Sequence, residues 1–167
     1  MNAESSDRTL LVLTSYHHRN TETVAKAIAD VLDAQIVAPK NVDLNAIQEV
    51  DLIGFGSGIY SAKHHETVLE LADSLPSATG RKAFIFSTTG APKIAITDDF
   101  VAKNHSLLRE KLQAKGYEIV GEFSCAGFNT NSFLHWFGGL NKGRPDADDL
   151  DRAREFARTL KQKMSEP

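Results

Sequence analysis

The sequence contains one cysteine, Cys125, among its 167 residues. A single cysteine cannot form an intramolecular disulfide, and it excludes a CxxC motif for metal binding or thiol redox chemistry. The chain also lacks an apolar run long enough to cross a membrane, and its first residues, MNAESSDR, do not follow the basic-then-apolar order of a signal peptide. We therefore expect a cytoplasmic protein with no membrane span.

The sequence also lacks an excess of positive charge. The net charge is -3 and no basic run occurs, which argues against a nucleic-acid partner. The 41% hydrophobic and 25% charged content is ordinary for a globular protein, and the length fits one domain with one sizeable core. We expect a single domain over residues 1–167, in which the polar residues 1–7 form a disordered tail.

Several familiar site motifs are missing. The GxxxxGK[ST] phosphate loop and the GxSxG nucleophile elbow are both absent. The stretch GFGSGI has Ile59 where the dinucleotide fingerprint needs its third glycine. A phospho-receiver domain needs clustered acids after its first strand, where this chain has Thr14, Ser15 and Tyr16. P-loop NTPases, Rossmann dinucleotide binders, α/β-hydrolases and receivers are therefore disfavoured.

The first strand and helix enclose a polar turn that can bind an anion. Leu10–Leu13 is an apolar run, and helical spacing follows at Val24, Ala25, Ile28, Val31 and Leu32. No carboxylate precedes Glu22 in the turn between them. Backbone N–H groups at such a helix N-terminus attract phosphate. An ordinary turn capped by Asn20 or Thr21 explains the same pattern, and both interpretations stay open.

Five strands are predicted in alternation with helices. The strands are Arg8–Thr14, Gln35–Ala38, Asp51–Phe55, Lys82–Phe86 and Tyr117–Cys125. Residues Asn41–Val50 are expected to be a connection or a weak helix. This alternation indicates an α/β fold, a doubly wound parallel sheet with helices on both faces.

The helices follow from apolar spacing and end signals. The first covers Thr21–Asp33, and the second has the apolar residues Val68, Leu69, Leu71, Ala72 and Leu75. The third begins with Asp98 or Asp99 as its cap, ends before Gly116 and buries Phe100, Val101, Leu107, Leu108 and Leu112. Pro145 starts the last helix, with acids at its positive end and a buried face of Leu150, Ala153, Phe156, Ala157, Leu160 and Met164.

Three polar or small-residue loops follow three of these strands, at Thr14–Thr23, Gly56–Lys63 and Ser87–Lys93. Ligands of doubly wound sheets bind beyond the carboxyl ends of the strands. The three loops are therefore expected to meet at one site.

The same loops carry a resemblance to the flavodoxin family. NTETVA, from Asn20 to Ala25, matches the NTExxA part of the family's SxTGNTExxA phosphate loop. GFGSGIY, from Gly54 to Tyr60, and FSTTGAP, from Phe86 to Pro92, are similar to the family's two flavin loops. SYHHxNT and NKGRPDADDL resemble a sub-group of short single-domain members. The resemblance implies a flavodoxin-like sheet of five strands in the order 2-1-3-4-5.

The resemblance also implies FMN as the cofactor and assigns residues to it. The first loop would bind the phosphate through Ser15, Tyr16, His18, Asn20 and Thr21. The second would lie along one face of the flavin and contribute Gly56, Ser57, Gly58, Ile59 and Tyr60, with Tyr60 stacked on the ring. The third would donate backbone N–H groups to the pyrimidine edge from Ser87, Thr88, Thr89 and Gly90.

The phosphate loop departs from the family pattern. Tyr16, His18 and Arg19 stand where the common loop has Ser, Thr and Gly. Either phosphate binding is weaker, or the phenol, imidazole and guanidinium groups replace the missing donors. His17 is expected to be a bystander, and for Tyr60 the alternative is a half-buried ring that closes its loop.

The expected function is electron transfer through FMN, with redox proteins as partners. One alternative is an FMN oxidoreductase that acts on a quinone, porphyrinogen or similar small acceptor, and another is a cofactor-free binding module, so the choice between carrier and enzyme stays open. No catalytic side chain and no metal site is predicted: His64 and His65 are interpreted as helix-start residues, and Cys125 as a packed residue. The aromatic residues of Ala126–Arg144 are expected to pack inside that segment, and the alternative is that they cover the site or a partner surface; they are Phe128, Phe133, Trp136 and Phe137.

Overall fold

A parallel β-sheet forms the centre of the computed structural model, which describes residues 8–16, 18–130 and 132–166. Its strand order is β2-β1-β3-β5-β6, and the short strand β4 pairs antiparallel with β3. The strands are β1 (Thr9–Thr14), β2 (Gln35–Val37), β3 (Leu52–Tyr60), β4 (Lys63–His64), β5 (Lys82–Thr89) and β6 (Glu118–Ala126). Without β4 this is the predicted order 2-1-3-4-5. The predicted tail, residues 1–7, and His17 lie outside the described residues.

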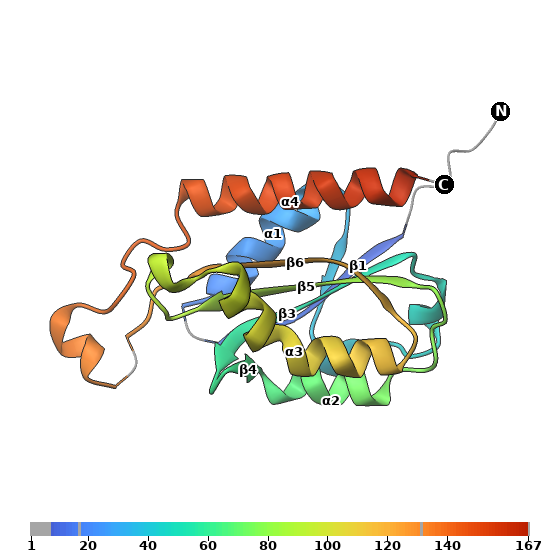
Figure 1. The fold of residues 1–167 in the computed structure, drawn as a ribbon, viewed down its shortest axis with the longest axis horizontal. Coiled ribbons are helices and arrows are strands. Elements are labelled where there is room, and N and C mark those ends of the chain that lie inside the picture. The colour runs from blue at the N-terminus through green and yellow to red at the C-terminus, as the bar shows by residue number, and fades with distance from the viewer. Residues whose placement is uncertain (1–7, 17, 131, 167) are drawn as a thin grey trace.

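Helices cover both faces of the sheet, as Figure 1 shows. Helices α1 (Asn20–Leu32) and α4 (Ala147–Ser165) lie on one face, and α2 (Glu66–Ser74) and α3 (Asp98–Ala114) lie on the other. Alternate residues of each strand face opposite helix layers, so Leu11 and Leu13 join one core cluster while Val12 joins the other. The predicted doubly wound α/β fold is confirmed.

The second apolar strand continues further than predicted. β3 extends past Phe55 through its glycines to Tyr60. A Cβ atom added to Gly54 would lie 2.3 Å from the Phe84 ring, and one added to Gly56 would lie 2.3 Å from the Phe86 ring. These two glycines therefore make room for aromatic rings inside the strand, and Gly56, which was predicted to start a loop, belongs to the strand as well.

Other boundaries are corrected in the same way. β5 continues to Thr89, so the predicted loop begins three residues later than Phe86 suggests. The predicted connection at 41–50 contains one short 3-10 turn, at Ala46–Glu49, and another, Pro39–Asn41, leads into it. Helix α3 is capped by Thr97, whose Oγ1 accepts a hydrogen bond from the Phe100 N–H at 3.2 Å, and neither Asp98 nor Asp99 is the cap. Gly116 follows α3 at φ +94°, as predicted for its position.

The buried face of α3 differs from the predicted one. Asn104 and His105 are buried along with Leu108 and Leu112, whereas Leu107 is 38% exposed. Helix α4 agrees better with its prediction, since Ala153, Ala157 and Leu160 are buried and Leu150, Phe156 and Met164 pack partly buried against the same cluster. An Asp146–Asp149 capping box begins α4.

The segment between β6 and α4 extends away from the body of the molecule and contains a 3-10 turn, Ser132–Phe137 (Figure 1). Trp136 and Phe137 are 78% and 81% exposed, so interior packing was the wrong expectation for these two. Phe128 is half-buried, and the side chain of Phe133 lies outside the description. No helix in the described ranges has the length and apolarity needed to cross a membrane.

Candidate functional site

A cleft lies at the carboxyl ends of β1, β3, β5 and β6. It brings together ten of the predicted site residues: Ser15, Tyr16, Asn20, Thr21, Gly58, Ile59, Tyr60, Thr88, Thr89 and Gly90. The sequence analysis missed three further lining residues, Gly127, Phe128 and Asn129. Among the described residues of this lining, none carries a carboxylate or an ammonium group.

The N-terminus of α1 opens into this cleft. Its N-cap residue, Arg19, has a left-handed backbone at φ 54°, and its own side chain does not cap the helix. The Arg19 guanidinium instead pairs with Glu22, with Nε 2.7 Å from Oε2. In the first turn the Glu22 N–H donates to the Ser15 hydroxyl at 3.4 Å. This turn carries the positive end of the helix dipole, so it can receive an anion.

Asn20 and Thr21 do not cap α1, contrary to the alternative drawn from the sequence. The Asn20 Nδ2 donates to the Phe128 carbonyl at 2.9 Å, and the Thr21 hydroxyl lies 2.8 Å from the Thr88 hydroxyl. Both side chains thus tie the first turn of α1 to other elements, Thr21 to the end of β5 and Asn20 to the loop after β6. These contacts fix the three segments relative to one another.

Two glycines allow the loops to approach this closely. A Cβ atom on Gly127 would lie 2.6 Å from Asn20 Nδ2, and one on Gly90 would lie 2.3 Å from Asn129 Nδ2. A side chain at either position would displace an amide group of the cleft. Gly127 had a weak signal in the sequence, because it lies two residues after the fifth predicted strand.

Aromatic rings form the outer rim of the cleft. The Tyr16 and Tyr60 rings lie 5.1 and 5.7 Å from the His65 ring, measured between centroids. Tyr16 is 63% exposed. Tyr60 is half-buried, and burial, followed by the neighbouring Tyr16, raises its pKa. His65 is the N-cap of α2 and accepts from the Thr67 N–H at 3.2 Å, which confirms its helix-start role.

Four of the predicted cofactor residues lie elsewhere. His18 is exposed and outside the cleft lining; its Nε2 lies 2.8 Å from the Thr130 hydroxyl, and its ring contacts Phe128. Gly56 is covered by the Phe86 ring, while Ser57 and Ser87 are fully buried beneath the cleft. Strand alternation explains the two serines, because their neighbours Gly58 and Thr88 line the cleft instead.

Two other predicted features have clear positions. Cys125 is buried as expected, and burial raises its pKa to about 12, so it remains a thiol. Asp146, Asp148 and Asp149 are close enough to share a cation, but their carboxylates pair with Arg144 and Lys93 at the start of α4. His64 was expected to start a helix; it lies in β4 and is buried.

Comparison with known proteins agrees with this geometry. The flavodoxin domain family matches residues 11–159. The chain belongs to the flavodoxin family. A relative from Methanocaldococcus jannaschii, named uncharacterized protein MJ0298, is 46% identical over 153 residues, which make up 92% of this chain and 97% of that protein.

Solved structures of flavodoxins share the fold. Flavodoxin 2 from Bacillus cereus aligns with a TM-score of 0.65 at 18% identity, covering 93% of this flavodoxin-family chain and 99% of that one. General stress protein 14 from Treponema denticola, solved in complex with FMN, aligns at 0.58 with 15% identity, covering 94% and 97%. Rubredoxin oxygen:oxidoreductase from Desulfovibrio gigas aligns at 0.65 with 13% identity over 95% of this chain and 36% of that one.

Proposed function

We propose that this flavodoxin-family protein binds FMN in the cleft and carries electrons between redox partner proteins in the cytoplasm. The observation that carries the proposal is the first turn of α1, which the side chain of its N-cap residue does not cap and which opens among neutral donors at the carboxyl ends of β1, β3 and β5. When bound, FMN supplies the redox chemistry. The chain's own residues bind and orient it.

The residues of the cleft fit the phosphate of FMN. A phosphate monoester carries nearly two negative charges near neutral pH. A carboxylate in the lining would repel that charge, and the described lining has none. Hydroxyl and amide groups from Ser15, Asn20, Thr21 and Asn129 surround the helix N-terminus. Each hydrogen bond from such a neutral donor to the charged phosphate contributes about 1.5–3 kcal/mol to the binding free energy.

The rim fits the flavin ring. Gly58, Ile59 and Tyr60 form one wall at the end of β3, and Tyr16 forms the other. Both tyrosines are flat and amphipathic, which suits a ring that is apolar on its faces and polar at its edges. The fold shared with the FMN complex of the Treponema protein supports the same assignment.

A second candidate function is an FMN oxidoreductase with a small acceptor such as a quinone. A cavity of about 780 Å³ adjoins the cleft and shares Ser15 and Tyr16 with it. Part of its wall is apolar, with Leu13, Ile36, Val37, Ala38, Pro39 and Leu71, and the rest is polar and includes the charged residues Glu22, Lys26, Lys40 and Glu70. Turnover of a quinone by NAD(P)H would favour this alternative, whereas electron exchange with protein partners alone would favour the carrier.

The absorption spectrum of the purified protein tests the central proposal. We expect flavin bands, and heat release followed by chromatography should identify FMN. Recovery of FAD or a nicotinamide would contradict the choice of cofactor. A colourless protein that leaves the fluorescence of added FMN unchanged would support a cofactor-free binding module.

Tyr60→Ala tests the ring site. Stacking on an aromatic ring is worth about 1–3 kcal/mol, by analogy with bases, so the FMN dissociation constant should rise by roughly ten- to a hundredfold. Fluorescence titration measures this constant. Tyr60→Phe is the matched control and should retain most of the affinity, because it keeps the ring. Equal affinity for the Ala variant and the wild type would make Tyr60 purely structural.

Thr21→Val tests the phosphate site. Removing one donor should weaken FMN binding by about tenfold or more and leave riboflavin, which lacks the phosphate, nearly unaffected. Thr23→Val, an exposed change on the same helix, is the control. His18→Ala should have the smaller effect, because His18 contacts Thr130 outside the cleft. A larger loss of FMN affinity for His18→Ala than for Thr21→Val would restore the prediction made from the sequence.

A further inference from the structure

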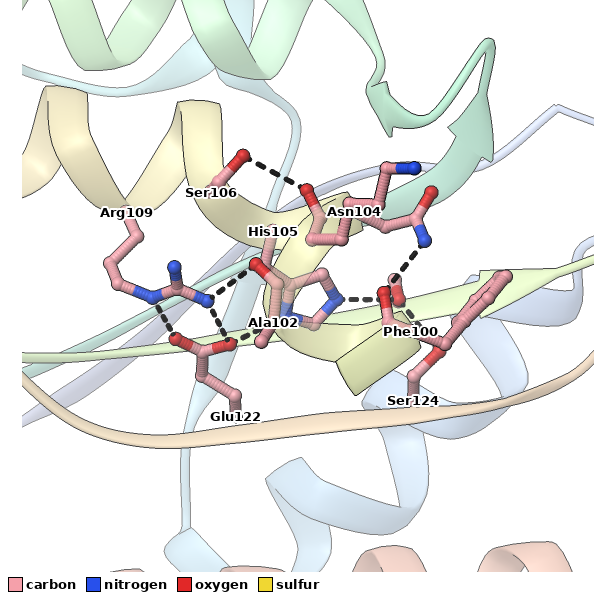
Figure 2. A network of polar contacts seen from close by, with 10 residues as sticks. Phe100, Ala102, Asn104, His105, Ser106, Arg109, Glu122 and Ser124 are labelled. Atoms are coloured by element: carbon pink, nitrogen blue, oxygen red, sulfur yellow. Dashed lines mark hydrogen bonds and ion pairs between the residues drawn. The ribbon is translucent and has the colours of Figure 1, made fainter. Parts of the chain in front are cut away.

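A buried polar cluster lies beneath the cleft, on the α2–α3 side of the sheet. Three serines occupy matching positions on neighbouring strands, because Ser57 pairs in register with Ser87 and Ser87 with Ser124. His105 of α3 approaches this row from above, as Figure 2 shows in part. We call the group the histidine cluster: Ser57, His64, Ser87, His105, Arg109, Glu122 and Ser124.

Hydrogen-bond directions indicate that His105 is an imidazolium. Its Nδ1 lies 3.1 Å from Glu122 Oε2, a carboxylate oxygen that only accepts (Figure 2). Its Nε2 lies 2.8 Å from Ser87 Oγ. The Ser87 hydroxyl donates its hydrogen bond to Ser124 Oγ at 2.9 Å, so it has no second proton to donate to Nε2. Both ring nitrogens must therefore donate. Glu122 balances the charge and also accepts from Arg109 Nη2 at 2.9 Å.

The order Ser87, His105, Glu122 is that of a serine-hydrolase triad, but the cluster cannot work as one. Ser87 and His105 are both 0% exposed, so no substrate reaches the hydroxyl. A doubly protonated ring also has no lone pair to act as a general base. The cluster is therefore not a hydrolase site.

The second histidine of the cluster, His64, is held in the neutral state. The Ser57 hydroxyl donates to the Gly58 carbonyl at 2.7 Å and accepts from the His65 N–H at 2.9 Å. His64 Nδ1, 3.0 Å from the same Oγ, is then the donor. In this neutral tautomer Nε2 is unprotonated, and it is buried with no hydrogen-bond partner in the described part of the chain.

A proton on His64 would be costly. It would create a buried N–H with no acceptor. The new charge would also lie close to the His105 cation, because the two ring centroids are 4.9 Å apart. The charged groups that act on His64 from the packed elements are His105 of α3 and Glu122 of β6, of opposite sign. Burial and then His105 lower the pKa of His64 well below its ordinary value, against a weaker opposing effect of Glu122.

We propose that His64 and His105 together hold one proton, on His105, and that a second proton, on His64, releases the β3–β4 hairpin from α3. His64 pairs with Ile59 in the hairpin, and its neighbour Lys63 pairs with Tyr60. Neutral His64 thus fixes the strand end that carries Tyr60 into the cleft. The hairpin is closed near neutral pH and opens in acid, so His64 is a positioning residue for Tyr60.

Nitrogen-15 NMR of the histidine rings tests the proposal on protein without flavin, so its outcome is independent of cofactor binding. We expect two protonated ring nitrogens on His105 and a proton only on Nδ1 of His64 at pH 7. On acidification, the Tyr60 resonances should change together with protonation of His64. A proton on Nε2 of neutral His64, or a singly protonated His105, would overturn the proposal, and neither measurement needs a variant.

His105→Gln sharpens the test. Removing the cation should raise the pH at which His64 titrates by about one unit or more, a tenfold gain in proton affinity. Lys103→Gln removes an exposed cation from the same helix and should leave the His64 titration unchanged. Equal shifts of the His64 titration in the two variants would contradict the coupling between His105 and His64. Tyr60 resonances that do not change when His64 is protonated would contradict the coupling between His64 and the hairpin.

Discussion

The two faces of the sheet are built from different chemistry. On the α1–α4 face, small and aliphatic side chains fill the helix contacts, with Ala25 and Ile28 from α1 and Ala153 and Ala157 from α4. On the α2–α3 face, the aliphatic cluster covers one part of the sheet, while Asn104 and His105 of α3 are buried among serines near the cleft. The first face provides packing, and the second combines packing with a charged network.

The difference follows the position of the cleft. Ser57, Ser87 and Ser124 lie near the carboxyl ends of their strands; Ser57 and Ser87 directly precede residues of the cleft lining, and Ser124 pairs in register with Ser87. Buried polar groups are stable only when their hydrogen bonds are satisfied, which fixes their geometry more narrowly than apolar contact does. The α2–α3 face therefore holds buried titratable groups next to the cleft, whereas the core of the α1–α4 face is packed mainly by apolar side chains.

The largest expected effect is on the apolar face. Phe84→Ala removes a fully buried ring that contacts Phe86 and Phe156, and it should lower the free energy of unfolding by about 3–5 kcal/mol. Urea denaturation measures the loss. Phe156→Ala is the comparison, because Phe156 is only partly buried and should cost less. A larger loss of unfolding free energy for Phe156→Ala than for Phe84→Ala would show that packing by α4 contributes more to stability than the buried ring of β5.

A pH-dependent effect is expected on the polar face. Burial alone raises the pKa of Glu122, but hydrogen bonds from Arg109 and His105 outweigh it and hold the pKa at about 2, below the ordinary 4.5. The unfolded state therefore binds the proton more readily, so Glu122 stabilises the fold above pH 4.5 and this contribution disappears as the pH falls toward 2.

Glu122→Gln should lower the free energy of unfolding by about 1–2 kcal/mol at pH 7, after allowance for solvent screening. The difference from the wild type should shrink as the pH falls from 4.5 toward 2. Denaturation at a series of pH values measures it. Glu118→Gln, an exposed change on the same strand, is the control. A difference that is constant with pH would assign the loss to packing.

The smallest effect concerns the start of α3. Thr97→Ala removes the hydroxyl that accepts the Phe100 N–H and should cost about 1 kcal/mol of unfolding free energy. Thr97→Ser keeps the hydroxyl and should restore most of the loss. If the Ala variant matches the wild type in thermal denaturation, Asp98 or Asp99 takes over the cap, as the sequence first suggested.

Local patterns were enough for the order of elements and for most of the cleft. Apolar runs marked each strand of the main sheet, and helical spacing marked each of the long helices. The loops that follow β1, β3 and β5 were recognisable because they contain small and polar residues directly after apolar runs. Ten predicted residues therefore line the cleft, and their contacts with FMN remain a prediction.

The sequence by itself determined the α/β class, the strand order through the family resemblance, and the end of the sheet that holds the cleft. Only the tertiary structure decided that Gly54 and Gly56 lie under phenylalanine rings, that Gly127 touches Asn20, and that two histidines 41 residues apart share a buried cluster. Periodicity is a property of neighbours along the chain. Register, ring packing and hydrogen-bond direction depend on which distant residues meet, so they appear only once the strands are paired.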